Sequence, residues 1–323
     1  MRIAVLMSTY QGEKFILEQM HSILHQLPSD GRVLVRDDGS TDGTVELIHS
    51  LGDQRITVIS GQNVGFVRSF FALLEAAPEV SDVVMLADQD DVWLPGKIAR
   101  AYSALANHAG PTLYCSRLKL VDAGLQPLGL TQPCPRGPSF ANALAENIVT
   151  GCTVALNRSA LELVLIRGDV KMMHFHDWWM YLVVSAFGEV LFDETPTILY
   201  RQHGGNVVGR GAGIGRYLIN LRFVVKQSWV HMMFSQIENF RLVHSPSLPL
   251  SKQKIIDRSF SPRNPRAIMR LLLTPVRHRQ FVVDEVLLRL MILVEIVSGR
   301  GLLPHRPPLT AGRNAPTQNG PDQ

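Results

Sequence analysis

Three carboxylates stand close together in Asp88-Gln89-Asp90-Asp91, directly after an apolar run. Carboxylates this near to one another repel unless a cation compensates their charge. Hard oxygen ligands on a short loop suit Mg²⁺ or Mn²⁺, and such an ion would neutralise charge that develops on a leaving nucleotide diphosphate. The alternative is a solvated acidic turn, with Asp90 or Asp91 capping the next helix. The segment therefore predicts a divalent-metal site.

Three further apolar runs also end in polar residues. Ser8-Thr9-Tyr10 follows the first, Asp37-Asp38-Gly39-Ser40 the second and Asn63-Val64-Gly65 the third. In open parallel α/β sheets, ligands bind outside the carboxyl ends of the strands. We therefore expect all four polar segments to meet at one edge of a sheet.

The elements that must position these residues follow from the hydrophobic pattern. Residues 1–115 alternate short β-branched runs with amphipathic helical stretches, which is typical of a parallel sheet with crossover helices. One such helix has Ile16, Met20, Ile23, Leu24 and Leu27 at helical spacing, and another spans Thr44–Leu51. The expected strands are Ile3–Met7, Val33–Arg36, Ile56–Ile59, Val83–Leu86 and Thr112–Cys115.

Later residues predict a second set of elements after a Pro/Gly-rich connection at Asp122–Pro138. Expected helices are Phe140–Glu146, Ser159–Ile166 and Trp178–Phe187, and expected strands are Thr153–Leu156 and Glu189–Phe192. A glycine-rich loop at 204–215 precedes helical stretches at about 216–244 and 266–298. We expect domain boundaries after residues 209 and 302, with halves 1–115 and 116–209 in the first domain and a disordered tail at 303–323.

Composition and charge limit the function classes. The chain has 323 residues, 46% of them hydrophobic, and its three cysteines have neither disulfide-framework nor zinc-site spacing. Residues 1–209 contain 15 Lys+Arg and 22 Asp+Glu, whereas residues 210–323 contain 17 and 6. A basic segment can serve nucleic acid or an anionic membrane. Its arginines are mixed with aliphatic runs rather than stacking aromatics, so we expect a membrane surface and no nucleic acid.

A membrane-spanning helix is not expected in the basic segment. Its most apolar part, residues 281–297, is interrupted by Asp284, Glu285, Arg289 and Glu295, and it contains no apolar span of about 18 residues. An interfacial amphipathic helix is one interpretation. The other is a helical pair that packs on the catalytic domain or on a partner subunit.

The polar segments together resemble glycosyltransferase family 2, over roughly residues 1–205. The motifs are Ser8-Thr9-Tyr10, Asp37-Asp38-Gly39-Ser40-Thr41-Asp42-Gly43-Thr44, Asn63-Val64-Gly65 and Asp88-Gln89-Asp90-Asp91-Val92-Trp93-Leu94-Pro95. The resemblance implies a GT-A fold, with a Rossmann-like, mostly parallel sheet flanked by helices, here with a helical C-terminal extension, and inversion at the anomeric carbon. It implies that Thr9, Asp37 and Asp38 hold the base and ribose. Asp90 would be the main metal ligand, with Asp88 near ribose or metal.

The resemblance extends to the second half. His176-Asp177-Trp178-Trp179 matches the segment that carries the family's catalytic base, which implies this role for Asp177; an ordinary helix N-cap is the alternative. Thr150-Gly151-Cys152 resembles the loop beneath sugar and acceptor, so Gly151, Cys152 and Trp178 are candidate acceptor contacts, although the tryptophans could be core. In Tyr200-Arg201-Gln202-His203, Arg201 could reach the diphosphate and His203 the metal. Asn63 and Arg68 are further candidate donor contacts.

These motifs are most similar to the rhamnosyltransferase-like branch of bacterial surface-polysaccharide assembly. That resemblance implies a dTDP-rhamnose donor, a saccharide or lipid-linked saccharide acceptor and a peripheral location at the cytosolic face of the cell membrane. A UDP-hexose donor and a non-catalytic scaffold are the alternatives. A dinucleotide-dependent oxidoreductase needs G-x-G-x-x-G where this chain has Ser8-Thr9-Tyr10-Gln11-Gly12. This chain lacks the P-loop motif of a P-loop kinase. It also lacks the basic glycine-rich loop that a nucleotidyltransferase would normally have after the first strand.

Overall fold

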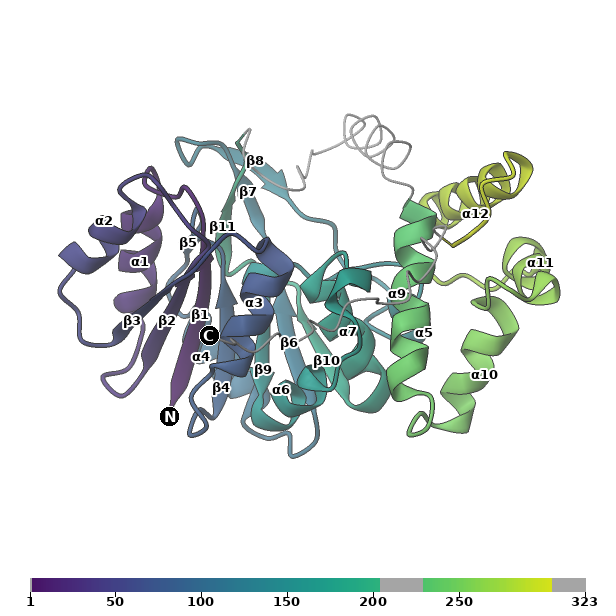
Figure 1. Cartoon of the computed structure of the whole chain (residues 1–323), viewed down its shortest axis with the longest axis horizontal. Coiled ribbons are helices and arrows are strands. Elements are labelled where there is room, and N and C mark those ends of the chain that lie inside the picture. Colours follow the sequence, from purple (N-terminus) through teal and green to yellow (C-terminus); the bar gives the residue numbers. More distant parts are fainter. Residues whose placement is uncertain (1, 204–228, 304–323) are drawn as a thin grey trace, which may run out of the picture.

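A seven-stranded sheet dominates the α/β part of the computed structural model, which describes residues 2–203 and 229–303 (Figure 1). Its strand order is β10-β6-β9-β4-β1-β2-β3. All neighbours are parallel except β9, which runs antiparallel to both β4 and β6. The strands are β1 (Ile3–Thr9), β2 (Arg32–Asp37), β3 (Ile56–Ser60), β4 (Val83–Ala87), β6 (Thr112–Ser116), β9 (Ala155–Asn157) and β10 (Glu189–Asp193).

Helices cover both faces of this sheet because its strands are apolar on both sides. In β1, Ile3, Val5 and Met7 pack on one face, while Ala4 and Leu6 pack on the other. The first face is covered by α1 (Ile16–Leu24), α2 (Thr44–Ser50) and α4 (Lys97–Leu105). The second is covered by α3 (Phe66–Glu75), α6 (Arg158–Leu165) and α7 (His176–Phe187). This is a doubly wound α/β sheet, as the sequence predicts.

The five strands predicted in the first half are confirmed, and each extends one or two residues further at its carboxyl end. The predicted strand Thr153–Leu156 is displaced, because Gly151–Thr153 forms a 3₁₀ turn (η1) and β9 begins only at Ala155. In that turn, the backbone N–H and the hydroxyl of Thr153 both donate to the Thr150 carbonyl. The predicted helix Phe140–Glu146 is shorter, as α5 (Phe140–Ala143).

A second, four-stranded sheet lies beside the first and was not predicted. Its order is β5-β11-β7-β8, from β5 (Val92–Trp93), β11 (Ile198–Arg201), β7 (Lys119–Val121) and β8 (Pro127–Leu130). The interpretation of 122–138 as a plain connection is therefore wrong, because β8 lies within it. All four β8 residues are exposed, and two of them, Pro127 and Gly129, are residue types that strands disfavour.

Four helices form the described part of the C-terminal extension: α9 (Trp229–His244), α10 (Leu250–Ser259), α11 (Pro265–Leu273) and α12 (Val282–Val297). The single helical stretch expected at 266–298 is broken between α11 and α12, at a segment that contains Pro275. The unpredicted α10 buries only Ile256 and so lacks an apolar stripe. The expected glycine-rich loop, the boundary after 209 and residues 304–323 lie outside the described residues.

Aromatic side chains join α9 to the α/β core. Trp229 stacks on Trp178 of α7 with ring centroids 4.8 Å apart. Phe240 lies among the rings of Phe140, Trp179 and Phe187 at 5.8–6.4 Å. The apolar core is therefore continuous from the sheet into α9, and one face of the extension packs on the domain, as one of the two interpretations predicts.

This continuity predicts that Phe240→Ala destabilises the whole described fold. Loss of a fully buried ring costs about 3 to 5 kcal/mol of unfolding free energy, whereas Leu242→Ala on the exposed side of the same helix changes it by less than about 0.5 kcal/mol. Urea unfolding followed by circular dichroism measures both. A separate early transition in the Phe240 variant, with the α/β part still unfolding as in the wild type, would contradict the shared core.

Candidate functional site

The carboxyl ends of β1, β2, β3 and β4 meet at one edge of the large sheet. The Thr9 hydroxyl donates to Asp37 Oδ2 at 2.9 Å, joining β1 to β2. The Gly61 N–H donates to the Asp37 carbonyl at 3.0 Å, joining β2 to the segment after β3. The convergence expected for the four polar segments is therefore present.

The Asp37 and Asp38 carboxylates organise the loops at this edge. Asp37 accepts hydrogen bonds from Thr9, from the Gly39 and Ser40 backbone N–H groups and from the Ser40 hydroxyl, at 2.6–3.1 Å. Asp38 is paired with Arg36 and accepts the Val64 and Gly65 N–H groups at 2.9 Å. Both carboxylates are buried, so their charges are stabilised inside the protein at the position predicted to hold the base and ribose.

Gln89 joins the acidic segment to the end of β1, a role that the sequence did not reveal. Its side-chain oxygen accepts the Tyr10 N–H at 2.8 Å, and its side-chain nitrogen donates to the Tyr10 carbonyl at 2.9 Å. Gly12 lies against this amide, and a Cβ atom there would stand 2.3 Å from the Gln89 oxygen. The pairing fixes the acidic segment relative to β1.

Asp91 points inward, whereas Asp88 and Asp90 are half-buried at the surface of the edge. The helix-cap interpretation of Asp91 is wrong: α4 begins after Gly96 without a side-chain cap, and Asp91 Oδ1 accepts the Arg201 N–H at 3.1 Å. Asp91 Oδ2 has no hydrogen-bond partner among the described residues. Burial, followed by the charges of Asp90 and Asp88, raises the pKa of Asp91 well above its usual range.

Cys152 lies beneath the acidic segment rather than facing an acceptor. It is fully buried, and its sulfur, an Asp88 oxygen and an Asp91 oxygen lie within 4.8 Å of one another. Burial and the two carboxylates raise the pKa of this thiol well above its ordinary value, so it is a poor metal ligand. The interpretation of Cys152 as an acceptor contact is therefore corrected to a packing role.

The Arg201 side chain holds the acidic segment, Asp88 to Asp91, from its buried side. This side chain is 2% exposed, its Nε donates to the Asp90 carbonyl at 2.8 Å and its Nη1 to the Ala123 carbonyl at 2.6 Å. Its Nη2 pairs with Glu18 at 2.5 Å, and the guanidinium lies 4.5 Å from the centre of the Phe15 ring. The buried guanidinium therefore holds the acidic segment in position, and its predicted reach to a diphosphate stays a prediction.

His203 and Asp90 meet at the open side of the same segment. Nε2 of His203 lies 2.7 Å from Asp90 Oδ2, and its ring lies 5.1 Å from the Phe15 ring. The structure thus brings together two of the three residues predicted to hold a metal. The third, Asp88, is close enough for the Asp90 charge to affect its pKa.

Asp177 reaches this edge from the first turn of α7. Its Oδ1 accepts from Asn147 Nδ2 at 3.0 Å and from the Trp178 N–H at 2.7 Å, and its Oδ2 accepts the Gly151 N–H at 3.1 Å. The N-cap position belongs to Phe175, so the simple N-cap alternative is wrong. The charge of Asp177 contributes to the raised pKa of Asp88, which places the two carboxylates in the same electrostatic site.

His176 and Trp178, the neighbours of Asp177, are core residues. Trp178 is 1% exposed and its Nε1 donates to the Ala143 carbonyl at 2.7 Å, so the core alternative replaces its predicted acceptor role. His176, which the sequence analysis did not single out, stacks on Phe70 at 4.2 Å, and a Cβ at Gly151 would lie 2.6 Å from its Nε2. Both side chains fix the position of Asp177.

Two predicted donor contacts, Asn63 and Arg68, lie exposed at the rim of the edge. Asn63 Oδ1 accepts the Gly65 N–H at 3.2 Å, just before α3 begins. Arg68 follows in the first turn of α3. The structure leaves both side chains available to a ligand at the strand ends.

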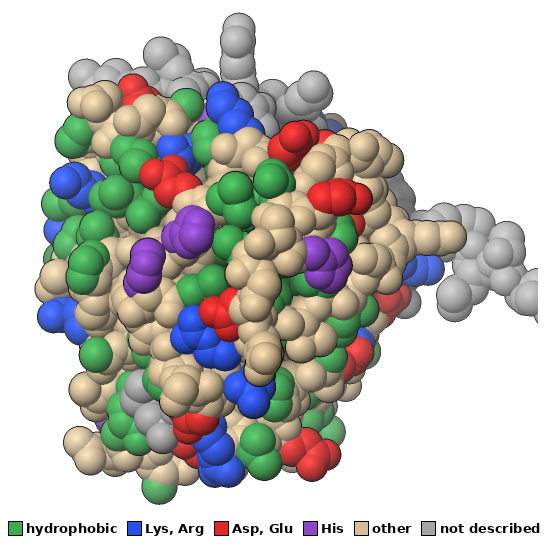
Figure 2. All heavy atoms as spheres, turned by 90° about the vertical axis from the view of Figure 1, so that its left-hand side faces the viewer, with side chains coloured by type: hydrophobic (Ala, Val, Ile, Leu, Met, Phe, Trp, Pro, Cys, Tyr) green, Lys and Arg blue, Asp and Glu red, His purple; other side chains and the backbone are tan. Residues whose placement is uncertain are grey.

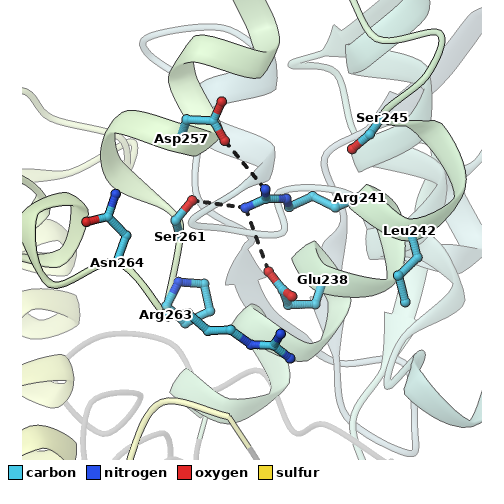
Figure 3. Close-up of a pocket in the computed structure, with 9 residues that line it drawn as sticks. Glu238, Arg241, Leu242, Ser245, Asp257, Ser261, Arg263 and Asn264 are labelled. Atoms are coloured by element: carbon cyan, nitrogen blue, oxygen red, sulfur yellow. Dashed lines mark hydrogen bonds and ion pairs between the residues drawn. The ribbon is translucent and has the colours of Figure 1, made fainter.

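A pocket of about 570 Å³ lies elsewhere, between α9, α10 and the segment that leads into α11 (Figure 3). Arg241 extends into it and contacts Ser261 at 2.9 Å, Asp257 at 3.5 Å and Glu238 at 3.8 Å. Two carboxylates compensate this guanidinium, and Arg263 also lines the pocket. The chemistry-bearing residues lie at the strand edge instead.

Known proteins are similar to this chain in sequence. The chain is 25% identical over 245 residues to the dTDP-rhamnosyl transferase RfbG of Shigella flexneri, covering 72% of this chain and 83% of the relative. It is 22% identical over 190 residues to the UDP-Glc:alpha-D-GlcNAc-diphosphoundecaprenol beta-1,3-glucosyltransferase WfgD of Escherichia coli, covering 56% and 69%.

Among solved structures, S. aureus TarS 1-349 in complex with UDP superposes with a TM-score of 0.54 at 16% identity, over 93% of this chain and 92% of that one. The complex of the same protein with UDP-GlcNAc gives 0.53, over 79% and 78%. These likenesses show the GT-A fold. Residues 4–162 match the family model for glycosyl transferase family 2 and form a domain of this family.

Proposed function

We propose that this protein moves rhamnose from dTDP-rhamnose to a hydroxyl of a lipid-linked saccharide, with inversion at the anomeric carbon, during assembly of a cell-surface polysaccharide. The observation that carries the proposal is the proximity of Asp177 to the acidic segment after β4. The Asp177 charge helps to raise the pKa of Asp88, and Gly151, which donates to Asp177, directly precedes Cys152 beside Asp88. The likeness to RfbG supports rhamnose as the sugar. The lipid-linked acceptor implies work at the cytosolic face of the cell membrane.

The proposed donor site is the edge formed by β1 to β4. Thr9, Asp37 and Asp38 form its buried floor, where base and ribose would lie. Asn63 and Arg68 stand at its rim, where Arg68 can contact phosphate oxygens. Gln89 and Arg201 act as positioning residues, because they fix the acidic segment against β1 and β11.

The residues of the acidic segment fit a divalent cation, Mg²⁺ or Mn²⁺, which would neutralise charge on the departing diphosphate. Burial, then the charges of Asp90 and Asp177, raises the pKa of Asp88 to about 7, so the site is short of positive charge. Half-buried oxygens of Asp88 and Asp90 are hard donors, and His203 can add a nitrogen. We assign these three residues as the ligands, with Asp90 as the main one.

Asp177 is the proposed general base. Its three N–H donors and the amino end of α7 favour a negative charge at this position. Among the described residues, Oδ2 accepts one hydrogen bond, from the Gly151 N–H, so it retains a lone pair for the proton of the acceptor hydroxyl. As that oxygen attacks the anomeric carbon, its proton passes to Asp177 and the bond to the diphosphate breaks. Gly151 lies beneath the attacking group.

A UDP-hexose donor is the second candidate, because the chain also resembles WfgD, whose name specifies UDP-Glc. The same residues would serve in either case. A panel of nucleotide sugars therefore distinguishes the donors without changing the proposed roles.

The roles of Asp177 and Asp90 predict a specific pattern of lost activity. Asp177→Asn keeps the shape of the side chain but cannot accept the proton, so we expect kcat to fall by about a hundredfold or more while donor binding is retained. Asp90→Ala should abolish metal-dependent turnover. Release of nucleoside diphosphate from dTDP-rhamnose, with a lipid-linked acceptor, measures both.

The matched control is Asp169→Asn, an exposed carboxylate that caps the short 3₁₀ helix Val170–Met172 (η2). Its turnover should equal that of the wild type. Full activity of Asp177→Asn would overturn the assignment of the base, and failure of the wild type to bind any nucleotide sugar in calorimetry would overturn the function.

The cation assignment makes a prediction that does not depend on turnover. Mn²⁺ bound only by the folded state raises Tm, and the rise grows with free metal above Kd. We expect this rise to be lost in Asp90→Asn and reduced in Asp88→Asn, with Asp169→Asn behaving as the wild type. Differential scanning fluorimetry with Mn²⁺ or EDTA measures it. An equal Mn²⁺ effect in all four proteins would place the ion elsewhere.

A further inference from the structure

Helix α12 exposes a wide apolar stripe, while its inward side buries three carboxylates together with Leu288 and Ile292. Asp284, Glu285 and Glu295 are buried, at 4–8% exposed. Val283, Val286, Leu290, Leu293, Val294 and Val297 are 46–79% exposed and recur at helical spacing along the opposite side. Leu288 and Ile292 already pack the inward side of α12 on the core, so the exposed stripe is a second apolar surface that is built to meet something other than water.

Polar contacts fix the inward orientation of the α12 carboxylates. Glu285 accepts the His278 and Arg279 N–H groups at 2.8 and 3.0 Å and pairs with Arg289 at 2.8 Å. Arg289 in turn donates to the Leu272, Thr274 and Val276 carbonyls at 2.6–3.2 Å. These bonds tie α12 to the end of α11, and a rotation of α12 that buried its apolar stripe would break them.

The neighbouring surface of α11 continues the same chemistry. Met269 and Leu273 are 52% and 73% exposed. Arg266 and Arg270 are exposed on the same helix. Since α11 contains no acidic residue and the acids of α12 are buried, the outer surface of the two helices presents apolar and cationic side chains without an exposed carboxylate.

The opposite end of the molecule has a different surface. Figure 1 shows α11 and α12 at one end of its long axis and α1 and α2 at the other. On the face seen in Figure 2, at the α1 and α2 end, apolar side chains are interspersed with basic, acidic and histidine side chains. The combination of apolar and cationic side chains without exposed carboxylates on α11 and α12 is therefore not a general property of the protein surface.

We propose that the outer surface of α11 and α12 docks on an anionic lipid bilayer. We call it the docking face: the six outward α12 residues named above, with Met269, Leu273, Arg266 and Arg270. The apolar stripe would enter the acyl boundary of the near leaflet, while the two guanidinium groups would contact phosphate oxygens. Helix α12 is about 24 Å long, and none of the described helices is long and apolar enough to cross a bilayer.

Charge complementarity favours a lipid surface over a second copy of the chain. A two-fold contact through the docking face would place Arg266 and Arg270 of both copies in one interface, with no exposed carboxylate on α11 or α12 to pair with them. A bilayer with anionic headgroups supplies both an apolar phase and the compensating charge. Docking would also hold the transferase close to a lipid-linked acceptor, so the inference extends the proposed function.

Co-sedimentation of the full chain with vesicles tests this, using phosphatidylcholine alone and phosphatidylcholine with roughly 30 mol% phosphatidylglycerol. We expect binding that requires the anionic lipid. Val286→Gln/Leu290→Gln/Leu293→Gln should abolish it, and Arg266→Gln/Arg270→Gln should weaken it by on the order of tenfold or more. The matched controls are Val80→Gln/Leu128→Gln/Ile166→Gln and Arg32→Gln/Lys171→Gln, which change exposed residues away from this surface and should bind as the wild type.

A second readout locates the contact. The three native cysteines are buried, so a polarity-sensitive dye on Leu290→Cys would report from the docking face, and its emission should shift to the blue on addition of anionic vesicles. A dye on Val80→Cys should not shift. Neither measurement uses donor or acceptor, so loss of docking can be told from failure of the proposed transfer reaction.

Three results would overturn the proposal. One is unchanged vesicle binding by the triple Gln variant of α12, and another is an equal loss in its control. The third is a wild type that does not bind vesicles and is a dimer by light scattering, where the triple Gln variant is a monomer. That result would assign the docking face to a second copy of the chain. Thermal unfolding of each variant shows that it is folded, since exposed substitutions change stability by only about 0.5 kcal/mol.

Discussion

The buried guanidinium of Arg201 holds together the segments on which the site depends. Three carboxylates after one strand repel one another, and their backbone stays in place because Arg201 donates to the Asp90 and Ala123 carbonyls and pairs with Glu18. The Arg201 N–H also fixes Asp91, whose inward turn separates it from Asp88 and Asp90. One side chain from the small sheet thus sets the geometry of the loop after β4 in the large sheet. Removal of its charge would leave buried polar groups without partners, which is costly.

The two halves of the α/β domain supply different parts of the site around Arg201. The ends of β1 to β4 supply a floor of buried carboxylates for the donor, and their charges are satisfied by backbone N–H groups and hydroxyls. The second half supplies Asp177, held by Asn147, Gly151 and its own helix at the side of the acidic segment. The helices after residue 228 share the core of the second half through Trp229 and Phe240, and their far side carries the docking face.

The sequence predicted the parallel strands, because alternation of apolar runs and helical stretches leaves a clear periodic signal. It also predicted which strand ends meet, since topology brings carboxyl ends to one edge. It did not predict the small sheet, whose strands have two to four residues, nor the inward turn of Asp91 and the burial of Cys152 and Arg201, and it gave the burial of Trp178 only as an alternative. These depend on contacts between segments far apart in the chain, such as Arg201 with Asp90, and no local pattern records them. The hydrogen bonds of Gln89 to Tyr10 could not be predicted for the same reason, although the sequence places Gln89 between carboxylates.

The central claim is that a cation and a nucleoside diphosphate bind between the acidic segment and Asp177. Anomalous diffraction from crystals grown with Mn²⁺ and a thymidine diphosphate tests it most directly. We predict a manganese peak in contact with Asp90, next to Asp88 and His203, with the diphosphate on its open side and Asp177 beyond. A peak in the pocket around Arg241, or a nucleotide bound away from Thr9, Asp37 and Asp38, would contradict it.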